Sequence, residues 1–265
     1  MASLYQTLKQ SNLLRCPASD ILIIGEVHRL TRLLGGRRWE IAAPLSEIGH
    51  TPVTAAHDED LFAWSRHRMT NGRSLTLLGC KEGLWGEAAG AVLRMLAEAS
   101  KAKSFIYVGK VGALPTGYAP NQTIVTGDKA FFAEGPEGPA STSKVPLTWT
   151  NPLARAIETA RTGIQVVSGD IVSVSTPLWE TSDWLAKWRG KTDWVDCETA
   201  HMAQAAIATG VEFGYLHIVS DNLVAQNHEN LSNEELEEVH EMRNQLYDMI
   251  EHIIITYLES AETTL

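Results

Sequence analysis

Short apolar runs that end on glycine or polar residues constrain the fold more than any other feature of this sequence. Residues 20–25 (DILIIG) form one run, and residues 74–78, 104–108 and 213–220 form three more. Such runs are typical of strands that are buried on both faces of a covered sheet. Helical patterns lie between them. We therefore expect an α/β fold in which a mixed central sheet is flanked by helices.

Several segments between these runs have the composition or the end signals of helices. The clearest are residues 84–100, 151–162, 198–209 and 232–259. The last of them opens with the capping box Ser232-x-x-Glu235 and carries an apolar stripe along one face. Residues 27–34 and 61–69 are also predicted to be helical. Shorter strands are expected at residues 51–56, 122–125, 163–176 and 194–197.

The length and composition suit one folded domain. The chain has 265 residues, of which 44% are hydrophobic, and this is enough for a single sizeable core. The segment GPEGPASTS at residues 135–143 predicts an exposed loop. We interpret it as an insertion, because strands and helices alternate on both sides of it. Residues 1–265 are therefore assigned to one domain, in which residues 1–19 could form an N-terminal extension.

The charge balance and the cysteines exclude several classes of function. The net charge is −10 and the Lys and Arg residues are scattered, which argues against a nucleic-acid partner. The three cysteines lie far apart, so we expect reduced thiols in the cytoplasm rather than disulfides or a metal site. The sequence has no run of about 18 apolar residues that would predict a membrane span. The glycines between residues 79 and 86 depart from the dinucleotide fingerprint, so no cofactor is expected.

Two groups of polar residues follow strands, which is where ligands bind in sheets of this kind. Asp196 and Glu198 stand at the junction of a strand and a helix, where they either cap the helix or serve a site. Asp221 follows a buried strand between Ser220 and Asn222, where it either ends the strand in an Asx turn or acts as a general acid. Taken alone, each group leaves both alternatives open.

One helix and one strand separate Glu198 from Asp221, so both carboxylates should reach the same edge of the sheet. The segments that hold them are DCETA (residues 196–200) and VEFGYLHIVSDNL (residues 211–223). They resemble a signature of the nucleoside phosphorylase and nucleosidase superfamily, in which acidic-Met-Glu-x-Ala precedes a helix and a buried strand ending in Ser-Asp. The resemblance implies an α/β enzyme with a three-layer fold that cleaves the bond between a base and ribose.

The resemblance also implies roles for individual residues. Asp221 would donate a proton toward N7 of a purine, and Glu198 would accept hydrogen bonds from the ribose hydroxyls. Cys197 takes the place of the family's methionine behind the ribose. The neighbouring substrate contacts would be Asp196, Cys197, Ser220 and Asn222.

Upstream segments resemble the phosphate- and base-binding parts of the same superfamily. Gly25 and Arg29 (IIGEVHR) resemble the first-strand motif of the hexameric phosphorylases, in which the arginine reaches phosphate from a neighbouring subunit. Lys110 and Gly112 lie in a Gly-x-x-Gly motif, and Val172 lies on the strand that would line the base pocket. Lys110 and Arg29 would bind phosphate. The resemblance thus implies a homo-oligomer, a dimer or a multiple of dimers, that takes a small nucleoside or nucleotide.

Several positions depart from the templates of the superfamily. Tyr107 and Lys110 stand where phosphorylases carry phosphate ligands, and Leu30 stands where nucleosidases carry a glutamate that orients water. Because Arg29 matches and no hydrolytic glutamate does, the sequence favours phosphorolysis with phosphate as co-substrate. Hydrolysis and nucleoside binding without catalysis stay open. Tryptophans predict either core packing or a subunit interface at Trp179, Trp184, Trp188 and Trp194.

Overall fold

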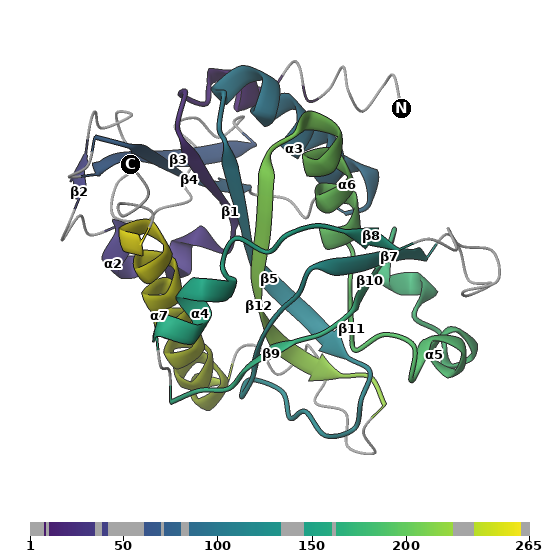
Figure 1. Ribbon diagram of the computed structural model, residues 1–265. Helices are drawn as coiled ribbons and strands as arrows, with labels where there is room; N and C mark the ends of the chain where they lie inside the picture. Colours follow the sequence, from purple (N-terminus) through teal and green to yellow (C-terminus); the bar gives the residue numbers. More distant parts are fainter. Residues whose placement is uncertain are drawn as a thin grey trace.

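The computed structural model gives an α/β architecture built on one large mixed sheet. The residues that it describes are 8, 11–34, 39–41, 61–69, 72–80, 85–133, 146–160, 163–224 and 236–260. Within them, 12 strands pair into the sheet and helices cover both of its faces (Figure 1). The fold class expected from the alternating apolar runs is therefore confirmed.

Three parallel strands form the centre of the sheet: β1 (Ile21–Gly25), β5 (Ser104–Ala113) and β12 (Glu212–Asn222). β5 lies between the other two, with Ile106 opposite Ile23 of β1 and Val108 opposite Leu216 of β12. All four of these side chains are fully buried. Strands that are covered on both faces need apolar residues on both sides, which is why the apolar runs occupy the centre.

Further strands extend the sheet in both directions. On one side lie β4 (Ser74–Cys80), parallel to β1, and then β3 (Phe62–Met69) and β2 (Trp39–Ile41), both antiparallel. On the other side β11 (Trp194–Asp196) pairs antiparallel with the end of β5 and is followed by β10 (Ile171–Val174), β7 (Lys129–Ala133) and β8 (Leu147–Thr148). β6 (Ile124–Thr126) joins β12 to β9 (Val166–Ser168).

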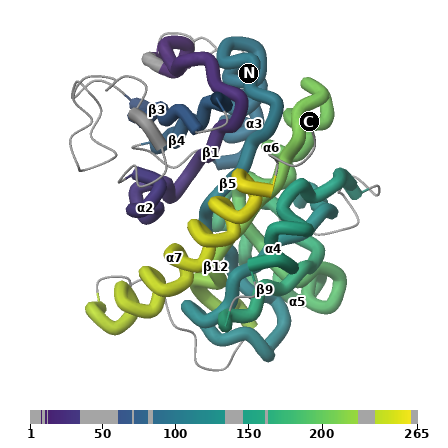
Figure 2. The backbone as a smooth tube through the Cα atoms, turned by 60° about the vertical axis from the view of Figure 1, so that its left-hand side comes forward, coloured from purple at the N-terminus to yellow at the C-terminus, as the bar shows by residue number. Residues whose placement is uncertain are grey.

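The helices form two layers. α3 (Glu87–Ser100) and α6 (Thr199–Thr209) pack together on one face, and α4 (Ala154–Ala160) and α7 (Glu237–Ser260) pack together on the other (Figures 1 and 2). Shorter helical segments are η1 (Asn12–Arg15), η2 (Val27–Arg29), α2 (Thr31–Leu34), η4 (Pro177–Trp179) and α5 (Ser182–Trp188). Among the helices described, none combines the length and the apolar character that a membrane crossing requires.

The structure corrects two expectations about elements. Residues 61–69, predicted to be helical, form β3, which pairs with β4 from Phe62 opposite Cys80 to Arg68 opposite Ser74. Its apolar spacing suits either element, and pairing with an available edge of the sheet decides between them. β5 does not end before the Gly-x-x-Gly motif but runs through it to Ala113. β7, β8 and α5 were not predicted from the sequence.

Other expectations concern the chain ends and the tryptophans. Trp184, Trp188 and Trp194 are buried in the core of the chain, which agrees with the core alternative.

Leu13 and Cys16, within the first 19 residues, are also buried, and η1 contacts α3. The strand expected at 51–56, the loop at 135–143 and the capping box of residues 232–235 lie outside the described residues.

Candidate active site

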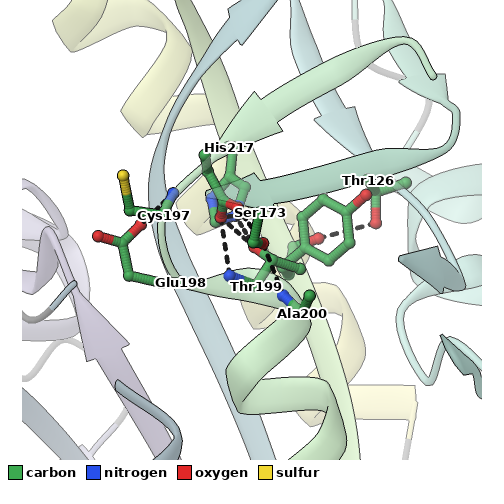
Figure 3. Close-up of polar contacts among 9 residues, drawn as sticks. Thr126, Ser173, Cys197, Glu198, Thr199, Ala200 and His217 are labelled. Carbon is green, nitrogen blue, oxygen red and sulfur yellow. Dashed lines mark hydrogen bonds and ion pairs between the residues drawn. The ribbon is translucent and has the colours of Figure 1, made fainter. Parts of the chain in front are cut away.

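Asp196 at the end of β11 caps helix α6, and Figure 3 shows its partners Ser173 and Thr199 beside Ala200 at the start of that helix. Its Oδ2 accepts hydrogen bonds from the backbone N–H of Thr199 at 2.9 Å and from the Thr199 hydroxyl at 2.5 Å. Its Oδ1 accepts one from the Ser173 hydroxyl at 2.5 Å, and Ser173 Oγ accepts the N–H of Ala200 at 2.8 Å. Both oxygens of this buried carboxylate are therefore used inside the fold. The substrate contact expected of Asp196 stays a prediction.

Glu198 is the helix-cap residue by position, but its side chain makes no capping hydrogen bond. Its Oε2 accepts the backbone N–H of Cys197 at 3.2 Å. Figure 3 shows Glu198 and Cys197 directed away from the Ser173–Thr199 cluster. Because Asp196 caps the helix, the carboxylate of Glu198 is left for a site.

The charge state of Glu198 is set by its surroundings. Burial and repulsion from Asp196 raise the pKa of Glu198 to about 8, against the hydrogen bonds from Cys197 and Tyr107. The Glu180 carboxylate adds a smaller repulsion. A group whose pKa lies near neutrality is typical of a functional site.

Asp221 directly follows a β-bulge in β12. The register with β5 shifts between Val219 and Asp221, so that Ser220 is extra and Asp221 lies opposite Gly112. The Ser220 hydroxyl donates to Asp221 Oδ1 at 2.7 Å. Bulges of this kind change the direction of the following side chain and are frequent beside active sites. Asp221 is partly exposed while its neighbours on the strand are buried, as a proton donor to a ligand requires.

Glu180, which sequence reasoning missed, faces both parts of the site. It follows η4 and is partly buried. Burial, followed by repulsion from Asp221 and Asp196, raises the pKa of Glu180 to about 8. Glu180 also raises the pKa of Cys197 and Glu198. The two carboxylates predicted to converge, Glu198 and Asp221, thus both lie within electrostatic reach of Glu180.

The segment after β1 presents a further carboxylate, that of Glu26. Gly25 has φ +109°, and a Cβ there would lie 2.1 Å from the carbonyl oxygen of Val108, so only glycine fits. The next residue, Glu26, donates its backbone N–H to that oxygen at 2.9 Å. Glu26 Oε1 lies 3.7 Å from Lys110 Nζ, and Glu26 Oε2 lies 3.4 Å from His28 Nε2. Glu26 and His28, which follow β1, therefore lie beside Lys110 of β5.

Arg29 and Leu30 occupy other surroundings. The Arg29 guanidinium lies against α7 of its own chain, with Nη1 3.4 Å from Asn244 Oδ1 and its centre 5.9 Å from the Tyr247 ring centroid. Leu30 is fully buried in the core. The position where nucleosidases carry their hydrolytic glutamate is therefore part of the packing here, and Glu26 is the carboxylate that this segment presents.

The remaining predicted substrate contacts are structural neighbours of the site. Val172 and Cys197 are buried in one apolar cluster, and burial raises the pKa of the Cys197 thiol. Asn222 donates to the carbonyl oxygens of Pro115 and Tyr118, both at 2.8 Å. A side chain at Gly112 would contact Leu223 and Val195. No group of His, Cys, Asp and Glu in the described part of the chain is arranged to hold a metal ion.

The carboxylates at the strand ends, and the strand–helix–strand unit that carries two of them, agree with one family match. Residues 34–255 match the Phosphorylase superfamily. The chain belongs to the phosphorylase superfamily. This membership confirms the resemblance drawn from residues 196–200 and 211–223, and it places the protein in a superfamily of enzymes.

Solved structures of nucleosidases share the fold of this phosphorylase-superfamily chain. Futalosine hydrolase of Helicobacter pylori superposes with a TM-score of 0.64 at 12% identity, covering 92% of this chain and 99% of that one. The 5′-methylthioadenosine/S-adenosylhomocysteine nucleosidase of Neisseria meningitidis gives 0.61 at 16% identity, covering 91% and 98%. That of Campylobacter jejuni gives 0.64 at 13%, covering 92% and 100%. No curated protein matches the chain by sequence.

Proposed function

We propose that this protein hydrolyses the N-glycosidic bond of a purine nucleoside. The observation that carries the proposal is that carboxylates stand at the ends of strands β1, β11 and β12. Asp196 caps helix α6, so the Glu198 side chain does not have to. Asp221 follows the bulge in β12, and Glu26 follows β1. Glu180 lies within electrostatic reach of Glu198 and Asp221.

This environment suits water better than phosphate as the nucleophile. The segment after β1 presents the carboxylate of Glu26, whose Oε1 lies 3.7 Å from Lys110 Nζ, so the cation that could hold phosphate already has an anionic partner. Tyr107, at the place of a phosphorylase phosphate ligand, packs edge to face against the buried His217 ring, with centroids 4.7 Å apart.

The proposed reaction divides its steps among three carboxylates. Glu26 accepts a proton from a water molecule, and the oxygen of that water bonds to C1′ of the ribose. The C1′–N9 bond breaks, and its electron pair leaves with the base. Asp221 donates a proton to N7, so that the base leaves neutral. Glu198 accepts hydrogen bonds from the ribose hydroxyls and holds the sugar in place. The products are free base and ribose.

The structural relatives support this direction. The proteins named above are a hydrolase and nucleosidases, and their fold is shared over more than nine-tenths of this chain. Phosphorolysis, which the sequence favoured, is the second candidate, because Lys110 lies within the Gly-x-x-Gly motif with 28% of its side chain exposed. Its ammonium group is the kind of ligand that phosphate takes.

Incubating the protein with a panel of purine nucleosides and nucleotides, with and without phosphate, tests the proposal. In water enriched in ¹⁸O, hydrolysis yields free ribose that carries one ¹⁸O at C1 and does not depend on phosphate. Ribose 1-phosphate formed only with phosphate present would establish phosphorolysis instead, and Arg29→Ala and Lys110→Met would then slow it. Bound but uncleaved nucleosides would identify a binding protein.

A further inference from the structure

We propose that His217 is a positioning residue that acts through the Thr199 hydroxyl to keep Asp196 in the cap of α6. Glu198, two residues further along the chain, is then left free for the ribose. The inference deepens the proposed function and rests on it, because it concerns the same carboxylate. His217 lies on β12 and Thr199 begins α6, and Figure 3 shows their side chains together at the start of that helix.

The hydrogen bonds around Thr199 fix the direction in which each proton points. His217 Nε2 lies 3.0 Å from Thr199 Oγ1 and 3.9 Å from Asp196 Oδ2. The Thr199 hydroxyl has a single proton, and it donates that proton to Asp196 Oδ2 at 2.5 Å. Thr199 Oγ1 can therefore only accept from His217, so Nε2 carries the imidazole proton and Nδ1 does not. Nδ1 is also the ring nitrogen that has no hydrogen-bond partner among the described residues.

Asp196 is ionised in this arrangement. The hydrogen bonds described at its carboxylate are all accepted by it, from the Ser173 hydroxyl and from the N–H and the hydroxyl of Thr199. Burial raises the pKa of Asp196, and these hydrogen bonds oppose that rise because they stabilise the anion. Burial lowers the pKa of His217 to about 3, so at ordinary pH a neutral imidazole is the donor to Thr199.

The His217 ring is held in place by its neighbours. It stacks on Tyr215, with centroids 4.7 Å apart and an interplanar angle of 26°. Tyr107 meets it edge to face, with centroids 4.7 Å apart and an angle of 77°. The side chain is fully buried, and its strand β12 is paired with β5 on one side and β6 on the other. A ring packed in this way keeps one orientation, which directs Nε2 at Thr199.

The cap leaves Glu198 free because the first N–H groups of α6 are already used. Asp196 accepts the Thr199 N–H at 2.9 Å, and Ser173 Oγ accepts the Ala200 N–H at 2.8 Å. Glu198 stands at the N-cap position but makes no capping hydrogen bond. N–H groups left open at the start of a helix attract a carboxylate. If the Thr199 hydroxyl were lost and the cap loosened, Glu198 would be drawn to the helix end and away from the ribose.

Thr199→Val tests this arrangement, because it removes the hydroxyl and keeps a side chain of the same shape. Thr199→Ser keeps the hydroxyl and should restore what the valine removes. Thr209→Val is the matched control, since Thr209 also lies on α6 but its hydroxyl donates to the carbonyl oxygen of Ala205 at 2.8 Å. Thermal melts verify that each variant is folded.

The first readout uses the protein without ligand. ¹⁵N NMR separates an imidazole nitrogen that carries a proton from one that does not, and His217→Phe identifies the signals by their loss. We expect a neutral His217 with its proton on Nε2 at pH 7 in the parent protein and in Thr209→Val. The Nε2 signal should move in Thr199→Val, because its acceptor is gone, and Thr199→Ser should return it toward the parental position.

The second readout is calorimetry in an Asp221→Asn background, which slows turnover, with adenosine and free adenine as probes. Thr199→Val should weaken adenosine binding roughly tenfold, because Glu198 no longer holds the sugar, and adenine binding should not change. Thr199→Ser should bind adenosine more tightly than Thr199→Val does. The decisive comparison adds Glu198→Gln: if Thr199 acts through Glu198, Thr199→Val should cause no further loss in that background.

The outcomes separate this inference from the proposed function. A proton on Nδ1 of His217 in the parent protein would overturn it, whatever the enzyme cleaves, because Thr199 would then have to donate to the ring. A further tenfold loss from Thr199→Val in the Glu198→Gln background would also overturn it, because the effect would bypass Glu198. If the parent protein binds neither adenosine nor any other nucleoside of the panel, the proposed function is refuted and the ribose role with it, and only the contact between His217 and Thr199 is left.

Discussion

Glu26 and Lys110 come from two adjacent parallel strands, and Glu26 Oε1 lies 3.7 Å from Lys110 Nζ. Glu26 comes from the segment after β1 and Lys110 from the middle of β5. In the proposed reaction this carboxylate accepts the proton of the attacking water.

The first prediction therefore concerns Glu26→Gln. If Glu26 accepts the proton of the attacking water, hydrolysis should slow by roughly 10²–10⁴-fold while the KM changes little. Steady-state assays on a purine nucleoside measure this, with Glu98→Gln on the exposed face of α3 as the control. A Glu26→Gln enzyme that hydrolyses at the parental rate would remove Glu26 from the mechanism.

Asp221→Asn is the test of the general acid. The amide keeps the shape of the side chain and can still pair with the Ser220 hydroxyl, but it has no proton to give to the base. Turnover should fall by roughly 10²–10⁴-fold with folding retained. Substrates with a better leaving group need less protonation, so their loss should be smaller. An equal loss for good and poor leaving groups would point to a defect in binding instead.

The sequence was most informative where one strand–helix–strand unit carries the chemistry. The spacing from Glu198 to Asp221 contains one helix and one strand, and such a unit has few ways to fold, so both carboxylates could be assigned to one site. The sequence could not predict that Asp196, rather than Glu198, caps helix α6. It depends on the Ser173 hydroxyl, which comes from β10, and no local pattern indicates that contact.

Other parts of the site depend on contacts across the sheet. Glu180 follows a short 3₁₀ segment with no motif around it, and only its approach to Asp221 gives it a role. The bulge at Ser220 has no sequence signal either, because it arises from the pairing of β12 with β5. Leu30 could have been recognised, since its neighbours Val27 and Leu33 share its buried face.

A third prediction contrasts Glu198→Gln with Asp196→Asn. Glu198→Gln should weaken nucleoside binding and leave free-base binding and stability nearly unchanged, because the side chain does not cap α6. Asp196→Asn should lower the free energy of unfolding by about 1–3 kcal/mol, because it weakens the bonds to Thr199 and Ser173. Calorimetry and urea denaturation on both variants measure the two effects. The reverse pattern would exchange the roles of the two carboxylates.

The pH dependence of stability gives a fourth prediction. The folded-state pKa values of Glu180 and Glu198 are raised from 4.5 to about 8, so the folded chain keeps protons that the unfolded chain has lost. The stabilisation is full below pH 4.5 and is lost as the pH rises toward 8. The buried histidines, whose ordinary pKa is 6.5, are largely neutral in both states only above about pH 7.5, so the free energy of unfolding should fall as the pH rises from 7.5 through 8.

Glu180→Gln isolates this effect. By removing one of the two groups, it should reduce the slope of unfolding free energy against pH by about half over that window. Urea denaturation at several pH values gives the slope, and Glu98→Gln, on the surface of α3, serves as the control. If the slope is the same in Glu180→Gln and in the control, Glu180 does not hold its proton in the folded state.

The last prediction is that the protein is a dimer or a multiple of dimers, with the contact beside the site. Leu178 of η4 is 84% exposed and Trp85 is 53% exposed. Both lie close to the site in the fold: Glu180 follows η4, and the residue after Trp85, Gly86, donates its N–H to the Cys197 carbonyl oxygen at 2.8 Å. Large apolar side chains left in water beside a functional site are typical of a surface that a second subunit covers.

Leu178→Glu should therefore lower the molar mass measured by light scattering toward that of one chain, because a charge would be buried in the contact. Ile207→Glu is the matched control, since Ile207 is also exposed, at 48%, but lies on α6 near its C-terminal end. Activity should fall with Leu178→Glu in proportion to dissociation, because η4 would lose the support that holds Glu180 in the site. A monomeric parent protein, or equal behaviour of the two variants, would show that this face is not the contact.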